Sequence, residues 1–314
     1  MENKKANHSI IPSILSSNHR AALVLAGGGT GALHSILQTA GASRFILDAQ
    51  IPYSPAALEK YTGGKIEHAV SIDAVKKMAD VALQTAGATM GIAVTAALQT
   101  DRRRRGDDRA LICIKTAGAE KLFSLHFSPA ARAEQEKILS DWILILIAHA
   151  AGVARGLILP GSFNPLHCGH IKLLRAAGEI TGLSGIFELS CANVDKAGVD
   201  ESECLCRAAA VRDIPVALTA APRFVQKAAL FPQTVFALGF DTVVRLIDYA
   251  ALEEWTQFKN AGAEFLVAGR MHNGAFKTLR DIQLPENYKT LFREIPEKSF
   301  HEDISSTELR NAGA

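Results

Sequence analysis

The sequence is poor in cysteine, in aromatic residues and in net charge. Its five cysteines are odd in number and irregularly spaced, which favours reduced thiols over a disulfide framework. Cys204 and Cys206 lack a CxxC spacing and a histidine partner of the kind that zinc sites use. The net charge of +2 indicates no polyanionic partner by itself. Without a wider basic surface or interleaved aromatics, we expect no nucleic-acid binding.

Long apolar runs are absent as well. The longest, Trp142–Val153, is interrupted by His149 and Gly152, is too short to span a bilayer, and predicts a buried helix instead. The first twenty residues are polar and contain no apolar core of a signal peptide. We therefore expect a cytoplasmic protein that has no membrane association.

At about 100–200 residues per domain, a chain of 314 residues predicts two domains. Two segments begin alike, with a short apolar run, a turn containing glycine and then a helical pattern. They start at Ala21 and Gly156, so we place the domains at residues 1–152 and 153–314. Periodicity predicts helices at Ile72–Gln84 and Gln135–Ala151, and buried strands at Gly91–Thr95 and Leu111–Lys115.

The arginine run 102–105 is the one conspicuous cluster of charge. Asp107 and Asp108 follow it, which indicates a solvated loop that its own aspartates partly neutralise. A contact with phosphate or nucleic acid is the alternative.

The second half carries two histidines at the start of a predicted helix. Residues Leu157–Leu174 read LILPGSFNPLHCGHIKLL, which predicts a buried strand, a turn of small residues and an amphipathic helix. The spacing places His167 and His170 on one side, beside amides that favour a phosphate. Fixed donors of this kind stabilise charge on the oxygens of a reacting phosphoryl group. Gly161 and Gly169 leave room for a nucleotide against the backbone.

A second pattern that suits phosphate lies near the end of the sequence, where residues 303–310 read DISSTELR. Ser305 and Glu308 have the spacing of a capping box, which predicts the start of a helix. Amides and hydroxyls at such a start can hold phosphate oxygens, and Arg310 can clamp the β- and γ-phosphates.

GSFNPLHCGH resembles the first signature of the nucleotidyltransferase α/β-phosphodiesterase superfamily, and ISSTELR resembles its second, ISSTxIR. The resemblance covers residues 155–310, and ISSTELR is most similar to the string of nicotinate and nicotinamide mononucleotide adenylyltransferases. It implies a Rossmann-like open parallel sheet, catalysis by His167, His170 and Arg310, and Mg²⁺ carried by the triphosphate without a dedicated protein site. The implied nucleotide-binding residues are Gly161, Ser162, Phe163, Gly169, Ser305, Ser306, Thr307 and Arg270.

Three positions resemble the acceptor side of that family. Asp241 follows the predicted strand that ends at Gly239, and such strand ends face the ligand crevice of an open α/β sheet. Trp255 resembles the tryptophan that stacks on a pyridine ring, but it lies farther from Asp241 than in the family, so a core position is the alternative. Lys196 resembles a residue of the loop through which the acceptor enters.

The first half contains a glycine-rich turn that fits two families. Gly27–Ala32 together with Asp48 satisfies the dinucleotide-binding fingerprint. We prefer a second resemblance, to the C-terminal domain of CinA-type proteins, the nicotinamide-mononucleotide deamidase family, because it explains five separated segments. These are residues 30–33, 41–43, 53–54, 69–71 and 94–95.

The resemblance to the deamidases fails at the catalytic positions. The family's serine aligns with Gly28, its lysine with Leu58, and the glycine of its VTG turn with Ala96. Without a hydroxyl nucleophile and its activating amine, amide hydrolysis lacks its attacking group. We expect a non-catalytic CinA-C-like α/β domain that can still bind a nucleotide or form an interface between subunits of a homo-oligomer.

The sequence as a whole predicts an α/β enzyme that transfers AMP from ATP to a phosphorylated small molecule, with a pyridine mononucleotide as the expected acceptor. Two enzymatic alternatives are a cytidylyltransferase and a phosphopantetheine adenylyltransferase. A non-catalytic, nucleotide-binding regulatory protein is the alternative of another class.

Overall fold

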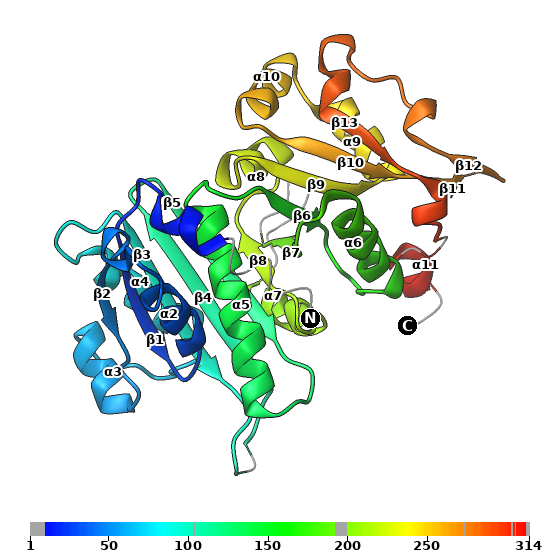
Figure 1. Cartoon of the computed structure of the whole chain (residues 1–314). Coiled ribbons are helices and arrows are strands. Elements are labelled where there is room, and N and C mark those ends of the chain that lie inside the picture. The colour runs from blue at the N-terminus through cyan, green and yellow to red at the C-terminus, as the bar shows by residue number, and fades with distance from the viewer. Residues whose placement is uncertain are drawn as a thin grey trace. The chain divides into compact units, whose positions relative to one another are not determined.

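The structure is a computed structural model that describes residues 10–102, 104–191, 200–272, 274–302, 304 and 306–311. The chain forms two compact units. Unit 1 comprises the residues up to Ala154 together with Val211–Ala217, and unit 2 comprises Arg155–Ala210 and the residues from Leu218 onward. Each unit contains one of the two strand–turn–helix patterns of the sequence (Figure 1).

Unit 1 is built on a mixed sheet. Its strands are β1 (Ala21–Ala26), β2 (Ile46–Gln50), β3 (Met90–Ala97), β4 (Arg109–Thr116) and β5 (Ala119–His126), in the order β5-β4-β3-β1-β2. Strand β1 is parallel to β2 and β3, whereas β4 is antiparallel to β3 and β5. The helices are α2 (Thr30–Leu37), α3 (Pro55–Thr62), α4 (Ile72–Leu83) and α5 (Arg132–Ala150), with a 3-10 turn η1 (Ala42–Arg44).

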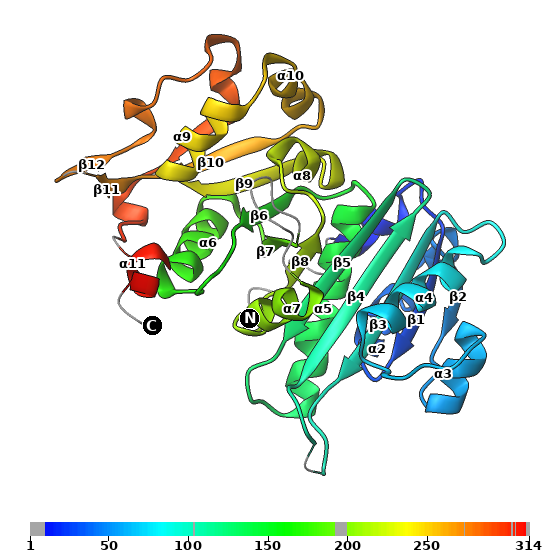
Figure 2. The same ribbon diagram turned by 180° about the vertical axis from the view of Figure 1, so that it is seen from behind.

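Helices cover both faces of this sheet, as the views in Figures 1 and 2 show for α4 and α5. Gly91 of β3 faces α4 so closely that a Cβ there would lie 2.4 Å from the carbonyl oxygen of Ala79. Val94, three residues later and on the opposite face, lies near Gly29, which also contacts Ile143 of α5. Strands covered on both faces read as continuous apolar runs, which explains the buried sequence of β3.

Unit 2 contains a set of mostly parallel strands and a small hairpin. The strands are β6 (Gly156–Pro160), β7 (Gly185–Ser190), β8 (Val216–Thr219), β9 (Thr234–Gly239), β10 (Glu264–Ala268) and β13 (Phe292–Ile295), in the order β13-β10-β9-β6-β7-β8. The first two residues of β8 belong to unit 1 and the last two to unit 2. The hairpin pairs β11 (Arg270–His272) with β12 (Ala275–Lys277). The helices are α6 (Cys168–Thr181), α7 (Glu201–Ala209), α8 (Phe224–Leu230), α9 (Phe240–Tyr249), α10 (Leu252–Asn260) and α11 (Ser306–Asn311), with 3-10 turns η2 (Leu279–Asp281), η3 (Glu286–Leu291) and η4 (Glu297–Ser299).

The strand order of unit 2 reverses between β6 and β9. From β6 the chain runs outward through β7 and β8, and it then returns to β9 on the other side of β6 and continues to β10 and β13. The neighbouring strands from β13 to β7 are parallel. In open parallel sheets, the loops after two such strands diverge and leave a ligand crevice at the carboxyl ends. The prediction of an open parallel sheet in the second half is confirmed.

The structure corrects one expectation about the cysteines. Cys191 at the end of β7 and Cys204 of α7 are joined by a disulfide, so the prediction of reduced thiols is wrong for this pair. Cys113, Cys168 and Cys206 are free. Irregular spacing along the sequence does not show which strand end and helix the fold brings together.

Within the residues that the structure describes, no helix has both the length and the apolar character that crossing a membrane requires.

Candidate functional site

Unit 2 contains a cavity of about 910 Å³ beside the reversal of strand order. This volume is in the range of small-molecule sites, about 300–1,000 Å³. The segments that follow β6, β9 and β10 form its walls together with the starts of α6, α8 and α9. The predicted site residues that line it are Gly161, Ser162, His167, Gly169, His170, Asp241, Arg270 and Ser306.

The two histidines form a stacked pair at the start of α6. His167 is the N-cap residue and His170 lies in the first turn, and their ring centroids are 3.7 Å apart at an interplanar angle of 28°. The backbone N–H of His167 donates to Nδ1 of His170 at 3.2 Å. Because Nδ1 accepts, we assign the proton of this ring to Nε2. Nδ1 of His167 is buried and has no hydrogen-bond partner among the described residues.

Both rings are held in the neutral form. Burial, with a smaller contribution from His167, lowers the pKa of His170 to about 4. Burial also lowers the pKa of His167; the guanidinium of Arg270 lowers it further, and Glu302 opposes the shift. A neutral imidazole offers one N–H donor and one acceptor nitrogen, so near neutral pH the pair can donate hydrogen bonds to phosphate oxygens.

Two neighbouring residues hold this pair in place. A Cβ at Gly169 would lie 3.0 Å from Nδ1 of His167 and 3.0 Å from Cγ2 of Ile304, so only glycine fits without displacing the ring. Phe163 is buried, and its ring meets that of His170 edge to face at a centroid distance of 5.2 Å. Its φ of 46° is unusual for a bulky side chain. Phe163 does not line the cavity and supports His170, which corrects its predicted contact with the nucleotide.

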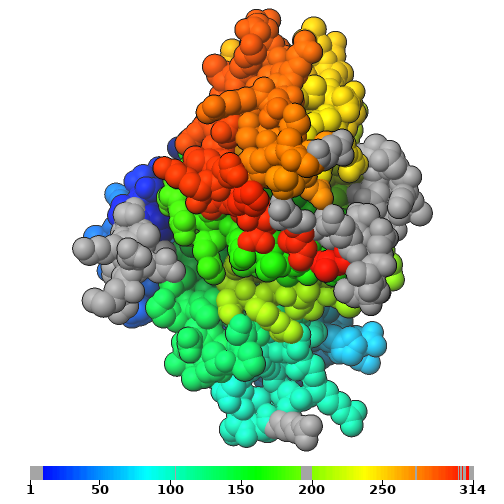
Figure 3. Space-filling model, turned by 90° about the vertical axis from the view of Figure 1, so that its right-hand side faces the viewer, coloured from blue at the N-terminus to red at the C-terminus, as the bar shows by residue number. Residues whose placement is uncertain are grey.

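The second signature packs against the loop that follows β6. Oγ of Ser306 donates to the carbonyl oxygen of Pro165 at 2.9 Å, and Nη1 of Arg310 donates to the carbonyl oxygen of Asn164. On the surface in Figure 3 the red C-terminal segment lies beside green residues of the segment after β6. Arg310 is not among the residues that line the cavity. The predicted residues Ser305 and Lys196, and the side chain of Thr307, lie outside what the structure describes.

Asp241 and Arg270 were predicted separately, and the fold brings them together. Asp241 lies in the first turn of α9, Arg270 begins β11, and their side chains form an ion pair on the cavity wall. This pair places one carboxylate and one guanidinium at the carboxyl ends of neighbouring strands β9 and β10.

The structure contradicts the predicted role of Trp255 and confirms the alternative. The indole is 3% exposed and packs against the rings of Phe258, Tyr288 and Phe292. It does not line the cavity and has no free face to offer to a pyridine ring. The helix α10 turns this residue toward β13 and η3, so Trp255 is a core residue.

Four cations that line the cavity were not predicted from the sequence, namely Arg207, Arg223, Lys227 and Arg245. Lys227 is buried and its ammonium lies 2.7 and 2.8 Å from the two carboxylate oxygens of Glu188. Arg245 could have been predicted, because it lies four residues after Asp241 and therefore on the same face of the helix. The sequence contains no comparable pattern for Arg207, Arg223 or Lys227. Among the described residues, no three side chains of His, Cys, Asp or Glu are grouped as metal ligands.

The glycine-rich turn of unit 1 is filled by a carboxylate of its own chain. Glu136 of α5 accepts hydrogen bonds from the backbone N–H of Gly29 at 2.8 Å, from the hydroxyl of Thr30 at 2.9 Å and from the N–H of Gly31 at 3.3 Å. These are the donors that a phosphate would use at the start of a helix. A bound phosphate would therefore have to displace Glu136, which weighs against the dinucleotide fingerprint.

The positions of the deamidase residues are also closed. A Cβ at Gly28 would lie 2.8 Å from Cδ1 of Leu98 and 3.0 Å from Oε2 of Glu136. Leu58, at the position of the family's lysine, is buried.

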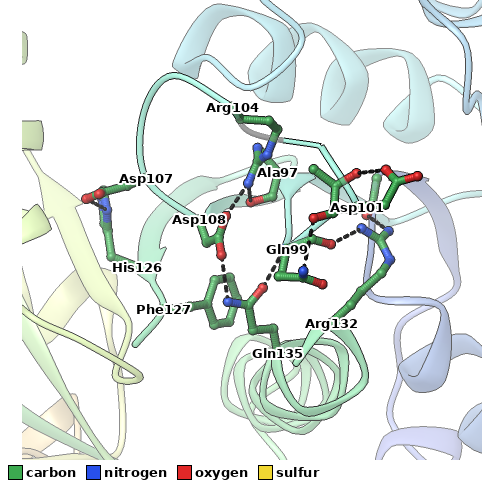
Figure 4. Close-up of polar contacts among 12 residues, drawn as sticks. Ala97, Gln99, Asp101, Arg104, Asp107, Asp108, His126, Phe127, Arg132 and Gln135 are labelled. Atoms are coloured by element: carbon green, nitrogen blue, oxygen red, sulfur yellow. Dashed lines mark hydrogen bonds and ion pairs between the residues drawn. The ribbon is translucent and has the colours of Figure 1, made fainter. Parts of the chain in front are cut away.

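The polar cluster beside this turn accounts for one arginine of the run, Arg104 (Figure 4). Arg104 donates to the carbonyl oxygen of Ala97 at 3.1 Å and pairs with Asp108. The buried Gln135 of α5 donates to Asp108 at 2.8 Å and accepts from the N–H of Gln99 at 2.7 Å. The loop's own aspartate therefore neutralises Arg104, as the sequence predicted.

Comparison with known proteins agrees with the chemistry of the cavity. Residues 158–312 match the family model described as cytidylyltransferase-like. Most of unit 2 is therefore similar to a cytidylyltransferase-like domain. The match includes both histidines, the Asp241–Arg270 pair and α11. No protein of curated function matches the sequence.

Two similar solved structures come from enterobacteria. A competence-damaged protein (CinA) superfamily protein from Klebsiella pneumoniae is 16% identical and covers 48% of this chain and 99% of its own, with a TM-score of 0.41. A competence or damage-inducible protein from Enterobacter asburiae is 18% identical and covers 46% of this chain and 96% of its own, with a TM-score of 0.40.

Proposed function

We propose that unit 2 transfers AMP from ATP, as its Mg²⁺ complex, to the phosphate of a pyridine mononucleotide. An oxygen of the acceptor phosphate attacks the α-phosphorus and forms the new P–O bond. The bond from the α-phosphorus to the bridging oxygen of the β-phosphate breaks, and pyrophosphate leaves. The products are a dinucleotide and pyrophosphate, and Mg²⁺ enters as part of the substrate.

One observation carries the proposal: a stacked pair of neutral imidazoles at the start of α6, on the wall of the cavity. The N–H groups of His167 and His170 donate to the non-bridging oxygens of the α-phosphate, where charge develops during transfer. Gly161, Ser162 and Ser306 line the same cavity and bind the triphosphate. The role of Arg310 at the β- and γ-phosphates rests on the ISSTELR string alone, since its guanidinium donates to the carbonyl oxygen of Asn164 in the structure. Asp241 and Arg270 face the acceptor and the nucleotide as one ion pair.

The choice of ATP and of a pyridine acceptor is supported by the ISSTELR string and no longer by Trp255. A second candidate, transfer of CMP from CTP to a phosphorylated alcohol, is favoured by the description of the matching family model. The chemistry at phosphorus is the same in both, so the two differ in base and acceptor alone.

The test is pyrophosphate release from ATP or CTP with nicotinate mononucleotide, nicotinamide mononucleotide, phosphopantetheine or phosphocholine. We expect ATP with a pyridine mononucleotide to react fastest. His167→Ala and His170→Ala should each lower kcat by about 10²–10³ without loss of fold. His272→Ala, an exposed histidine outside the cavity, is the matched control and should keep parent turnover. Preference for CTP would establish the second candidate, and near-parent turnover of either histidine variant would remove the proposed mechanism.

A further inference from the structure

Helix α9 presents a polar face to the cavity. Asp241, Arg245 and Tyr249 are spaced four residues apart and all three line it. Residues at this spacing lie on one side of a helix. The opposite side, with Val243 and Leu246, is fully buried. The sheet therefore fixes α9, and its polar side chains form part of the cavity wall.

Arg245 differs from the other arginines of the cavity in its partners. Nε of Arg207 donates to Glu203 at 3.0 Å, and the guanidinium of Arg223 lies 2.8 Å from a carboxylate oxygen of Glu254. The guanidinium of Arg270 pairs with Asp241. Of the residues that the structure describes, none places a carboxylate within ion-pairing distance of Arg245, whose side chain is exposed to the cavity.

The place of Arg245 along α9 separates it from the reacting phosphate. Arg270, the partner of Asp241, is close enough to the histidine pair to lower the pKa of His167. Arg245 lies four residues, or about one helical turn, after Asp241. This separates the two Cα atoms by about 6 Å along the helix axis. The cavity wall therefore carries a second guanidinium farther along α9 than the Asp241–Arg270 pair.

We propose that Arg245 binds a second anionic group of the acceptor, a carboxylate, so that the enzyme takes the acid form of a pyridine mononucleotide in preference to the amide form. This inference rests on the proposed function. A planar guanidinium forms two parallel hydrogen bonds with a carboxylate, whereas a neutral carboxamide cannot accept the same charged pair. Asp248, which also lines the cavity on α9, makes no ion pair with Arg245 among the described contacts.

The experiment measures KM for ATP, nicotinate mononucleotide and nicotinamide mononucleotide by pyrophosphate release. The parent should show the lower KM for the acid. Arg245→Gln should raise the KM for the acid by about ten- to a hundredfold, the range for hydrogen bonds between charged groups. The KM values for ATP and for the amide should change less than about twofold. Arg245→Lys, which keeps the charge and loses the two-pronged geometry, should fall between parent and Arg245→Gln.

Two controls match the substitution. Arg280→Gln removes an arginine whose side chain is 87% exposed and lies outside the cavity, and it should leave all three KM values unchanged. Asp248→Asn removes a negative charge from the same helix, so it should lower the KM for the acid.

The outcomes separate the two claims. If the parent turns over neither pyridine mononucleotide, the proposed function fails and the role of Arg245 fails with it. If the parent turns over both, but Arg245→Gln raises their KM values equally or not at all, the proposed function stands and the carboxylate proposal is wrong. If the substitution raises the KM for ATP alone, Arg245 serves the triphosphate and the proposal is again overturned.

Discussion

Replacement of His170 by asparagine should flatten the dependence of the stability of unit 2 on pH. Burial lowers the pKa of this histidine from 6.5 in the unfolded chain to about 4 in the folded protein. Between these values the unfolded state binds a proton that the folded state does not. Stability is therefore fully present above 6.5 and is lost as the pH falls toward 4.

The magnitude follows from the size of that difference. At 1.36 kcal/mol per pKa unit, the full difference corresponds to about 3 kcal/mol. The ring is partly exposed to solvent, which screens the effect, so we expect His170 to account for about 1–3 kcal/mol between about pH 7 and about pH 4. The pKa of His167 is lowered as well, so this residue also makes the free energy of unfolding fall as the pH decreases. That contribution remains in the His170→Asn variant.

The two tryptophans make this measurable for unit 2 alone, since Trp142 lies in unit 1 and Trp255 in the core of unit 2. In a Trp142→Phe background, fluorescence during urea unfolding at a series of pH values reports on Trp255. His272→Asn, at an exposed position of β11, is the control and should keep the slope of the parent. A His170→Asn curve as steep as that of the parent would show that the ring is not held neutral.

Three further predictions test other parts of the structure. Trp255→Ala should lower the free energy of unfolding of unit 2 by about 3–5 kcal/mol, because it empties a packed core position. An increase in the acceptor KM without this loss would contradict the core position. Glu136→Gln should destabilise unit 1 by about 1–3 kcal/mol in urea unfolding, since the amides of the glycine turn lose a charged acceptor. Glu134→Gln, exposed on the same helix, should be neutral, and equal effects of the two would refute the role of Glu136. Gly28→Ser should release no ammonia from nicotinamide mononucleotide, because the serine is crowded and Leu58 replaces the activating lysine; ammonia release would show that the alignment is wrong.

Elements whose pattern is local could be predicted closely from the sequence. The predicted helix Ile72–Gln84 corresponds to α4 (Ile72–Leu83), and the predicted strand Gly91–Thr95 lies within β3 (Met90–Ala97). The turn after β6 could also be predicted, because a strand, a turn of small residues and an amphipathic helix follow one another within about twenty residues. In each case the residues that determine the element are neighbours in the chain.

The acceptor side of the cavity could not be predicted in the same way. Whether Trp255 faces a ligand or the core depends on how α10 packs against β13 and η3, which begin about thirty residues later. Its aromatic character fits both positions equally well. The ion pair of Asp241 with Arg270 likewise depends on the alignment of β9 with β10, and the sequence indicated each residue without indicating the pair.

The two glycine-containing turns show why local pattern does not decide function. Each follows a buried strand and opens a helix, whose first backbone amides favour an anion. In unit 1 the anion is Glu136, which lies more than a hundred residues away in sequence and satisfies the amides permanently. In unit 2 the residues brought from afar are Ser306 and Arg310, whose side chains bond to carbonyl oxygens of the loop after β6. Among the described hydrogen bonds, none joins a carboxylate to the backbone amides at the start of α6, so this turn, and not the first, is open to the phosphates of the proposed nucleotide.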